Sequence, residues 1–220
     1  MAIVRSIDEI AAVVTAAATA AVAATTTSRP AERTIVGIVG SPGAGKSTVG
    51  EALVARLNEL SAGAQLVSMD GFHLPQSRLV ELGRRERMGA PDTFDVDGFV
   101  ALLERLRAGT GEVTAPGFDR EIEEATPGTV SIADDRRVIV VEGNYLLHDQ
   151  GGWQRVAPLL DLGLFVGLER SIRLARLIAR HERYGKSTAD AAAWALGPDE
   201  ANARLIERTA GRADHEVRLG

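Results

Sequence analysis

The residues best suited to chemistry in this chain form a glycine-rich segment that ends in a lysine and a serine, Gly40-Ser41-Pro42-Gly43-Ala44-Gly45-Lys46-Ser47. The spacing G-x-x-x-x-G-K-[ST] is that of a P-loop, in which backbone N–H groups and a helix N-terminus surround phosphate oxygens. In such a loop Lys46 would contact the β- and γ-phosphates of a nucleotide, and the Ser47 hydroxyl would bind Mg2+. The residues expected to bind ATP are Gly40, Ser41, Gly43, Ala44, Gly45, Lys46, Ser47 and Thr48.

The segments on either side of this loop have the patterns that a P-loop requires. The run 34–39 is apolar and rich in β-branched residues, which predicts a buried strand. After Lys46, apolar residues recur at helical spacing, which predicts an amphipathic helix. The alternative is an ordinary glycine-rich turn before a helix, and the flanking strand and helix argue against it.

Two carboxylates come at the ends of further predicted strands. The segment 65–70 ends in Asp70, and the segment 137–143 carries Glu142 next to its last residue. The carboxyl ends of parallel strands meet at one edge of a sheet, so both groups should lie near the P-loop. One could take the proton from an attacking hydroxyl while the other helps to hold Mg2+, and we assign Asp70 as the base and Glu142 to the metal. Which carboxylate has which role stays open, and simple helix capping is the structural alternative.

Four arginines recur along a predicted helix from Ser171 to about Tyr184. Arg173, Arg176, Arg180 and Arg183 are three, four and three residues apart, which places them on one helical face. Such a stripe is usually a solvated surface. Beside a P-loop, however, it could close over the transferred phosphoryl group as a lid at about 170–190, with Arg176 and Arg180 as catalytic residues. We interpret 185–187, Gly-Lys-Ser, as a turn within that lid.

The rest of the chain alternates between predicted strands and helices. Residues 71–95 lack periodicity, and residues 111–132 read as an irregular hairpin. Other helices are expected at 96–108, 153–160, 187–196 and 198–210, and other strands at 162–168 and, weakly, 214–219. This order predicts an α/β fold, a doubly wound parallel sheet of the type found in P-loop nucleoside triphosphate hydrolases, with a helical lid.

The N-terminal region could be mistaken for a targeting signal. Residues 10–24 are rich in alanine, but the apolar stretch is too short to span a bilayer comfortably, and acidic residues stand where a signal peptide needs positive charge. Ser6 and Glu9 have capping-box spacing, which predicts a helix that packs on the domain. We therefore expect residues 1–29 to form a helix and a linker, with 25–30 as the linker, and residues 30–220 to form one kinase domain.

Composition narrows the classes of function. The 220 residues carry a net charge of −5 without a dense basic block, which argues against nucleic acid as the main partner. There is no cysteine, which excludes disulfides, thiolate metal sites and cysteine catalysis. His73, His148 and His181 are not spaced as a metal site, and Trp153 and Trp194 are expected in the core. A protein that uses ATP and has this composition is expected in the cytoplasm, with no membrane partner.

Beyond these separate patterns, an ordered set of motifs from Thr34 to the C-terminus resembles the phosphoribulokinase, uridine kinase and bacterial pantothenate kinase group of P-loop kinases. The motifs are Gly40 to Thr48, Met69 to His73, Pro91 to Asp95, Pro116 to Arg120 and Val141 to Tyr145. The resemblance implies that Asp70 is the catalytic aspartate. It also implies an acceptor site formed by Phe72, His73, Phe94, Asp95, Phe118, Asp119, Arg120, Asn144 and Tyr145.

The motif around Asp70 departs from that of uridine kinases, which typically have Ser-Phe-Tyr after the aspartate. Here Gly71-Phe72-His73 is nearer the pantothenate kinase pattern, and Asn144-Tyr145 replaces an aliphatic position. We predict an ATP- and Mg2+-dependent kinase of a small metabolite, with a nucleoside, a pantothenate-like molecule or a sugar as acceptor. The alternative is a regulatory nucleotide-binding switch that acts on a partner protein, although a guanine signature Asn-Lys-x-Asp is absent. A homodimer is left open.

Overall fold

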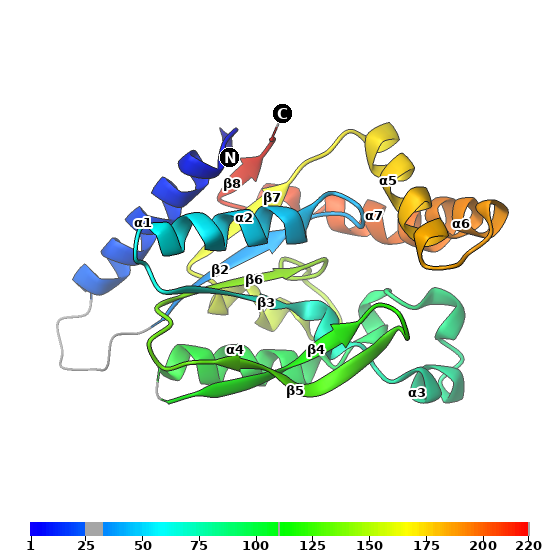
Figure 1. Cartoon of the computed structure of the whole chain (residues 1–220), viewed down its shortest axis with the longest axis horizontal. Helices are drawn as coiled ribbons and strands as arrows, with labels where there is room; N and C mark the ends of the chain where they lie inside the picture. Colours follow the sequence, from blue (N-terminus) through cyan, green and yellow to red (C-terminus); the bar gives the residue numbers. More distant parts are fainter. Residues whose placement is uncertain (25–32, 110, 220) are drawn as a thin grey trace.

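The fold is organised around a parallel six-stranded sheet, seen in a computed structural model that describes residues 1–24, 33–109 and 111–219 (Figure 1). Every pairing within the sheet is parallel. The strand order is β1 (Ala2–Val4), β8 (His215–Val217), β7 (Leu162–Val166), β2 (Thr34–Val39), β6 (Val138–Gly143) and β3 (Ala64–Ser68). The P-loop strand β2 is therefore central, with the Glu142 strand β6 beside it.

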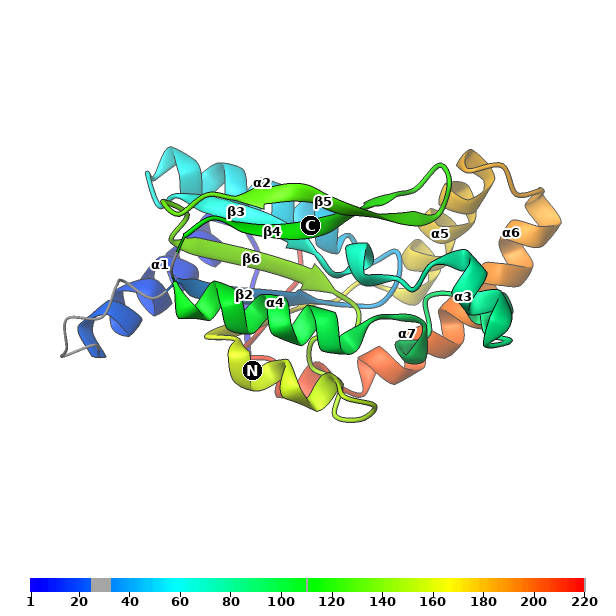
Figure 2. The same ribbon diagram turned by 90° about the horizontal axis from the view of Figure 1, so that it is seen from below.

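Helices cover both faces of the sheet, as the alternation of strands and helices predicts. The helices are α1 (Ile7–Ala24), α2 (Lys46–Glu59), α3 (Gln76–Glu81), α4 (Val96–Ala108), α5 (Arg170–Arg183), α6 (Thr188–Trp194) and α7 (Glu200–Glu207). Helices α1 and α2 lie on one face and α4 on the other, while α5 and α6 extend beyond the end of the sheet (Figures 1 and 2). This doubly wound arrangement confirms the predicted fold class.

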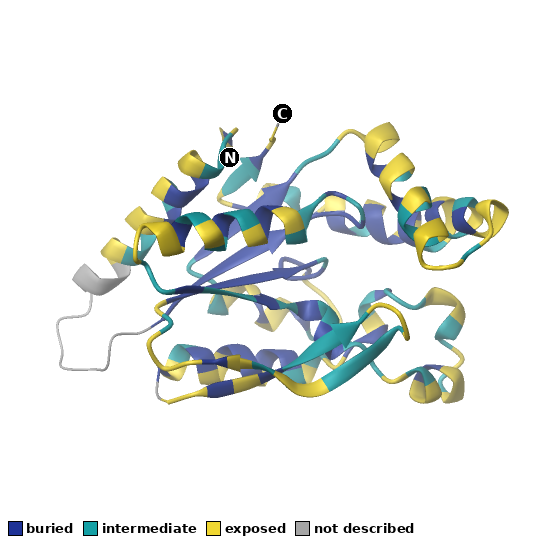
Figure 3. Ribbon diagram, in the orientation of Figure 1, coloured by how far each residue is buried: buried dark blue, intermediate teal, exposed yellow. Residues whose placement is uncertain are grey.

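The sheet has a hydrophobic core on each of its faces, because side chains along each strand alternate between the two faces. In β2, Ile35 and Val39 pack with α4, whereas Val36 and Ile38 pack with α1 and α2, because successive side chains of a strand point to opposite faces. Figure 3 shows the strands buried and the outer faces of α1, α2 and α5 exposed. Such two-sided burial is typical of a parallel sheet and holds the strand ends in place.

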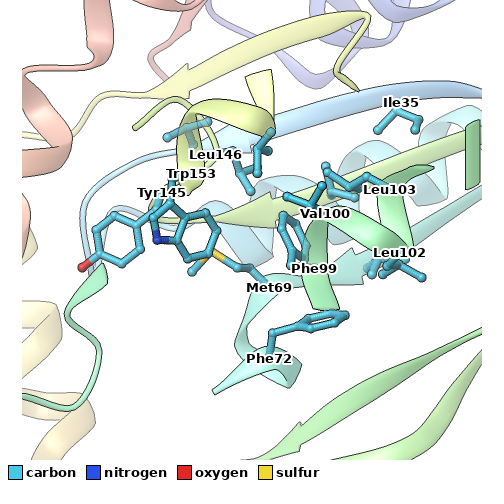
Figure 4. Packing of buried hydrophobic residues seen from close by; sticks show 14 of the residues in the cluster. Ile35, Met69, Phe72, Phe99, Val100, Leu102, Leu103, Tyr145, Leu146 and Trp153 are labelled. Atoms are coloured by element: carbon cyan, nitrogen blue, oxygen red, sulfur yellow. The ribbon is translucent and has the colours of Figure 1, made fainter. Parts of the chain in front are cut away.

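The core on the α4 side is the more aromatic one. Phe99 and Trp153 are fully buried there, with ring centroids 5.9 Å apart, and Leu102 and Leu103 extend the contact along α4 (Figure 4). The Trp153 indole N–H donates to the carbonyl of Pro91 at 3.0 Å, so its polar atom is satisfied. Trp153 is thus a core residue, as expected.

An antiparallel hairpin formed by β4 (Val113–Asp119) and β5 (Glu124–Ile132) makes a separate two-stranded sheet that lies alongside β3 (Figure 2). Its register shifts between Ala115 and Gly117, which accounts for the irregular pattern in the sequence. It packs on the 3₁₀ turn η1 (Met69–Phe72), where a Cβ on Gly71 would lie 2.2 Å from the carbonyl oxygen of Pro116. Only glycine permits this close approach.

Several boundaries differ from those expected. The strand predicted over 65–70 ends at Ser68, and Asp70 lies in η1, because the Ser68 hydroxyl accepts the Asp70 N–H and turns the chain. The segment 153–160 forms two 3₁₀ turns, η4 (Trp153–Arg155) and η5 (Ala157–Leu159). Between α6 and α7 the chain stays helical through a π turn at Ala195–Asp199, so Pro198 does not separate them.

The N-terminal residues belong to the main sheet. Strand β1, which the sequence did not predict, pairs with β8, and the expected C-terminal strand is present between β1 and β7. The Ser6 hydroxyl accepts the Glu9 N–H at 3.2 Å, which confirms the start of the alanine-rich helix. The linker expected at 25–30 lies outside the described residues. Across the described chain, no helix combines the length and apolar character needed to cross a membrane.

Candidate active site

The P-loop connects β2 to α2 and lies beside the first turns of α5 (Figure 1). Gly45 has φ of 97°, a conformation that strains residues with a side chain, and helix α2 begins directly after it at Lys46. The Lys46 ammonium donates to the Ser41 carbonyl at 3.3 Å and forms no ion pair within the described chain. The loop therefore has the form that the sequence predicted.

A cavity of about 470 Å³, which we call the P-loop cavity, opens on this loop. It is lined by Gly43, Ala44, Gly45, Lys46, Ser47, Thr48, Val49, Val166, Gly167, Leu168, Arg176, Arg180 and Leu219. Gly40 and Ser41 do not line it: Gly40 packs against the backbone of Val166, and Ser41 is buried with its hydroxyl 3.5 Å from Glu207. Backbone N–H groups, one lysine and two arginines make this cavity suitable for phosphate groups.

A second cavity, of about 150 Å³, adjoins the P-loop, and we call it the polar cavity. It is lined by Pro42, Lys46, Ser47, Asp70, His73, Arg85, Met88, Gly89, Phe118, Arg120, Glu123, Glu142, Asn144, Arg180, His181, Trp194, Asp199 and Asn202. Lys46, Ser47 and Arg180 line both cavities, so they stand where the two meet. A phosphate in one cavity and a second molecule in the other would both be in reach of these three side chains.

Asp70 and Glu142 converge on the polar cavity, as their positions after two neighbouring strands predicted. Ser68 of β3 pairs in register with Glu142 of β6, and its hydroxyl donates to the Glu142 carboxylate at 2.5 Å. Asp70 follows two residues later and accepts a hydrogen bond from the Arg120 guanidinium at 2.7 Å. The β4–β5 hairpin thus supplies the arginine that orients the carboxylate of η1.

The two carboxylates are held in different electrostatic states. Burial raises the pKa of Glu142, and the neighbouring charge of Asp70 raises it further, against the opposing effect of Lys46. Burial also disfavours ionised Asp70, but the nearby cations Arg120 and Lys46 favour it, and the Asp70 pKa is lowered. Asp70 is therefore the carboxylate that stays ionised and able to accept a proton or a hydrogen bond at neutral pH.

Helix α5 divides its arginines between two environments. Arg176 and Arg180 face the P-loop cavity, in agreement with the expected stripe, and Arg183 lies farther along beside Arg176 on the exposed surface. The expectation that Arg173 belongs to the free face is wrong, because Arg173 is 1% exposed and pairs with Glu200 at 2.5 Å. Its position on the helix turns it towards the N-terminus of α7. The turn at 185–187 joins α5 to α6, as expected.

The acceptor residues implied by the resemblance fall into two groups. His73, Phe118, Arg120 and Asn144 line the polar cavity. The other five have structural positions. Phe72 and Tyr145 are buried in the core (Figure 4), as is Phe94, and the Tyr145 hydroxyl donates to the carbonyl of Gly89. Asp95 and Asp119 accept backbone N–H groups in a helix cap and a turn. None of these five lines the polar cavity, although the Phe94 ring packs on that of His73 with the centroids 4.0 Å apart.

Further polar residues of the cavity were missed from the sequence. They are Arg85, Glu123, His181, Trp194, Asp199 and Asn202. Trp194 was expected in the core, but it is only partly buried, and Lys186 lies 4.7 Å above its ring. His181 and Asp199 contact each other at 2.7 Å through the π turn that the sequence did not predict. The one available signal was the unusual density of charged residues between 84 and 95 and after 180.

The donor set near the P-loop fits a magnesium ion bound with a nucleotide. Mg2+ prefers oxygen ligands and takes one or two from the protein, with phosphates and water completing an octahedron. Ser47 and Glu142 offer such oxygens on one cavity wall. Within the described residues, no group of three or more His, Cys, Asp or Glu side chains forms a separate metal site.

Comparison with known proteins agrees with this geometry. The model of the Phosphoribulokinase / Uridine kinase family matches residues 35–218. YggC of Escherichia coli, an uncharacterized protein, is 33% identical over 197 residues, which cover 88% of this chain and 81% of that protein. A provisionally named uridine kinase of Schizosaccharomyces pombe is 32% identical over 157 residues, covering 68% of this chain and 67% of that one.

The same relationship holds in three dimensions. The crystal structure of a provisionally named fructose transport system kinase from Silicibacter sp. TM1040 superposes with a TM-score of 0.86. The two sequences are 34% identical, and the superposition covers 97% of this chain and 99% of that one. The family model spans the P-loop, both strand-end carboxylates and helix α5. The chain therefore belongs to the phosphoribulokinase/uridine kinase family and is an ATP-dependent phosphotransferase.

Proposed function

We propose that the γ-phosphoryl group of ATP, bound in the P-loop cavity, is transferred to a hydroxyl of a small metabolite bound in the polar cavity. The observation that carries this proposal is the set of three side chains common to both cavities, Lys46, Ser47 and Arg180. Phosphoryl transfer depends mainly on positioning the donor and acceptor oxygens in line and on neutralising charge between them. The two cations and the hydroxyl at the boundary of the cavities can both position the reacting oxygens and neutralise their charge.

In this mechanism Asp70 accepts the proton of the attacking hydroxyl. Its lowered pKa keeps it ionised, and the hydrogen bond from Arg120 fixes the carboxylate at the cavity wall. A strong base is not needed, because in a loose transition state the proton leaves late and the base mainly orients the nucleophile. After transfer, the proton resides on Asp70 and the new phosphate ester occupies the polar cavity.

Lys46 and Arg180 supply the counter-charge for the transferred group. Neither forms an ion pair within the described chain, so both can hydrogen-bond phosphate oxygens without losing a partner. Arg176 lines only the P-loop cavity and is assigned to the phosphates nearer the nucleoside. The charge that develops on the phosphoryl oxygens is thereby met by cations already in place.

Magnesium would be held by the Ser47 hydroxyl and the Glu142 carboxylate, with phosphate oxygens and water completing its coordination. When bound, the ion neutralises phosphate charge and keeps the γ-phosphoryl group in line. The raised pKa of Glu142 reflects burial near Asp70, and a nearby dication would favour its ionised form. A direct readout is the thermal shift of the protein with Mg2+ and ADP, which Glu142→Gln should reduce.

The test of the proposed function is acceptor-dependent phosphorylation. The purified chain is incubated with ATP, Mg2+ and small acceptors, and both ADP and the phosphorylated acceptor are measured, the latter by mass spectrometry. ADP formation that requires an acceptor, and that is lost in Lys46→Ala, supports the kinase. ADP formed at one rate whether or not any acceptor is present contradicts it and points instead to a nucleotide-hydrolysing switch.

A further inference from the structure

The cations on the acceptor side of the polar cavity are already matched with carboxylates. Arg85 pairs with Glu123 at 2.9 Å, and Arg120 pairs with Asp70 at 2.7 Å. His181 contacts Asp199 at 2.7 Å. Within the described chain, the cavity cations without an ion pair are Lys46 and Arg180, and both also line the P-loop cavity where phosphates bind.

This pairing disfavours an acceptor that carries its own negative charge. A carboxylate or phosphate on the acceptor would compete with Glu123 for Arg85 and with Asp199 for the ring N–H of His181. Asp199 would then be left unpaired in a buried site, where such a loss usually exceeds the gain from the new contact, whereas Glu123, with a side chain 41% exposed, would lose less. Asp199 is 8% exposed, so water could not easily replace its partner.

The uncharged polar groups of the cavity match hydroxyl groups. The Nδ1 of His73 lies 2.8 Å from the Asp70 carbonyl, which can only accept, so Nδ1 carries the proton and Nε2 is left as an acceptor. Burial lowers the His73 pKa despite the charge of Asp70, which keeps the ring neutral. The amides of Asn144 and Asn202 have no hydrogen-bond partner within the described chain, and Asn202 is 7% exposed. A hydroxyl both donates and accepts, so it can satisfy each of these groups.

The aromatic rings of the cavity are largely occupied by protein groups. The ring of Phe118 packs on that of His73, with the centroids 4.8 Å apart, and the Arg120 guanidinium lies 5.9 Å from the Phe118 ring centroid. Lys186 lies 4.7 Å above Trp194. A nucleobase is usually held between open aromatic or apolar surfaces, and these rings do not form such a slot. Trp194 lines the cavity, so its ring can still contact the C–H surface of a sugar or polyol.

From these contacts we infer that the acceptor is a neutral, hydroxyl-rich molecule of the monosaccharide or polyol class, without a carboxylate, phosphate or nucleobase. This inference rests on the proposed kinase function and narrows its substrate. In this inference Asn202, Asn144 and His73 form hydrogen bonds with the acceptor hydroxyls. The Arg85–Glu123 and His181–Asp199 pairs disfavour the binding of anionic acceptors.

The first experiment compares acceptors that share a carbon skeleton and differ in charge. The kcat/KM is measured for hexoses and pentoses and their alditols, for the matching aldonic acids and sugar phosphates, and for uridine and pantothenate. We expect at least about tenfold higher kcat/KM for the best neutral sugar or polyol than for its charged derivative. Phosphorylation confined to charged acceptors or nucleosides overturns the inference and leaves the kinase function standing. If no acceptor of any class is phosphorylated, the kinase proposal fails and this inference fails with it.

The second experiment tests the cause of the selectivity. Glu123→Gln removes the carboxylate that pairs with Arg85, so a cation becomes free in the cavity. The kcat/KM for an aldonic acid should rise about tenfold relative to that for the parent sugar. Glu81→Gln is the matched control, because it breaks the exposed Arg78–Glu81 pair outside the cavity and should change neither value. With both variants melting as the parent does, an unchanged ratio in Glu123→Gln would overturn the assignment of this pair to anion exclusion.

Discussion

On the P-loop side of the site, Lys46 and Arg180 form no ion pair with a carboxylate of the described chain, whereas on the other side Arg85 and Arg120 each lie against one. Both sides of the site carry basic side chains, so residue types alone do not distinguish them. The two sides differ in whether these side chains are paired with carboxylates. Free cations suit a polyanionic donor, and paired cations act as rigid polar walls for an uncharged acceptor.

Among the substitutions considered, Lys46→Ala should reduce the rate of phosphoryl transfer the most. It removes a cation from the boundary of the two cavities, and one positive charge on a transferred phosphoryl group is worth roughly 10³- to 10⁵-fold in rate. The readout is kcat for the best acceptor, with circular dichroism and thermal melting to show that the fold persists. Turnover near the parent rate would remove the P-loop lysine from the mechanism.

Asp70→Asn should have the next largest effect. The amide keeps the size of the side chain but cannot take the proton, so kcat should fall by roughly 10²- to 10⁴-fold with ATP affinity nearly unchanged. Asp119→Asn is a matched control, because Asp119 serves a turn and does not line the polar cavity. A collapse of ATP binding in Asp70→Asn would instead indicate that Asp70 acts through Mg2+ and that Glu142 is the better candidate for the base.

Arg173 and Arg170 share one carboxylate but differ in burial, and this difference tests how α5 is anchored. Arg173 has a side chain 2% exposed and Arg170 one that is 59% exposed, and both contact Glu200. Arg173→Met should lower the free energy of unfolding by about 3 kcal/mol, because a buried carboxylate loses its buried partner. Arg170→Met should cost less than about 1 kcal/mol. Equal effects in urea unfolding would show that burial does not distinguish the two contacts.

Arg180→Ala should slow transfer by about 10²-fold, the usual loss for one donor to a transition-state oxygen. Its effect on ATP affinity should be smaller, since Arg176 and the loop backbone remain. Arg183→Ala provides the comparison on the same helix face, because Arg183 lies on the exposed surface away from the polar cavity. Similar rates in the two variants would mean that the arginines of α5 are a solvated face.

The sequence predicted the fold and the P-loop side because local patterns determine them. The run 34–39, the glycines and Lys46 are contiguous, and the strand-end positions of Asp70 and Glu142 follow from the rule that parallel strands end together. Strand β1 was missed because a segment of three residues is too short to show the alternation of apolar and polar residues that predicts a strand. Its pairing with β8 defines it as a strand.

The sequence did not predict the contributions of Arg85, Glu123 and Asp199 to the polar cavity, because distant segments bring them together. Glu123 comes from the hairpin turn, Arg85 from the segment after α3, and Asp199 from a π turn that keeps the helix continuous past Pro198. No periodicity predicts which of these charges will pair. The arginine stripe shows the same limit, since spacing placed Arg173 with Arg176 and Arg180 but could not show that Glu200 buries it.

The smallest expected effect concerns the motion of α5. Its first turns are anchored, because Arg173 is buried against Glu200 and Leu177 is fully buried beside the P-loop, where a Cβ on Gly43 would lie 2.7 Å from it. Residues 182–185, at its end and just beyond, are exposed, and surface charges there gain little because water and salt screen them. ATP supplies a counter-charge to Arg176 and Arg180, so amide exchange should slow after about residue 177 and change little before it. Hydrogen exchange with and without a non-hydrolysable ATP analogue and Mg2+ measures this boundary. Protection that changes equally along 170–190 would mean that the whole helix moves as one lid, and no change anywhere would mean that α5 is fixed and the nucleotide binds to a site already closed.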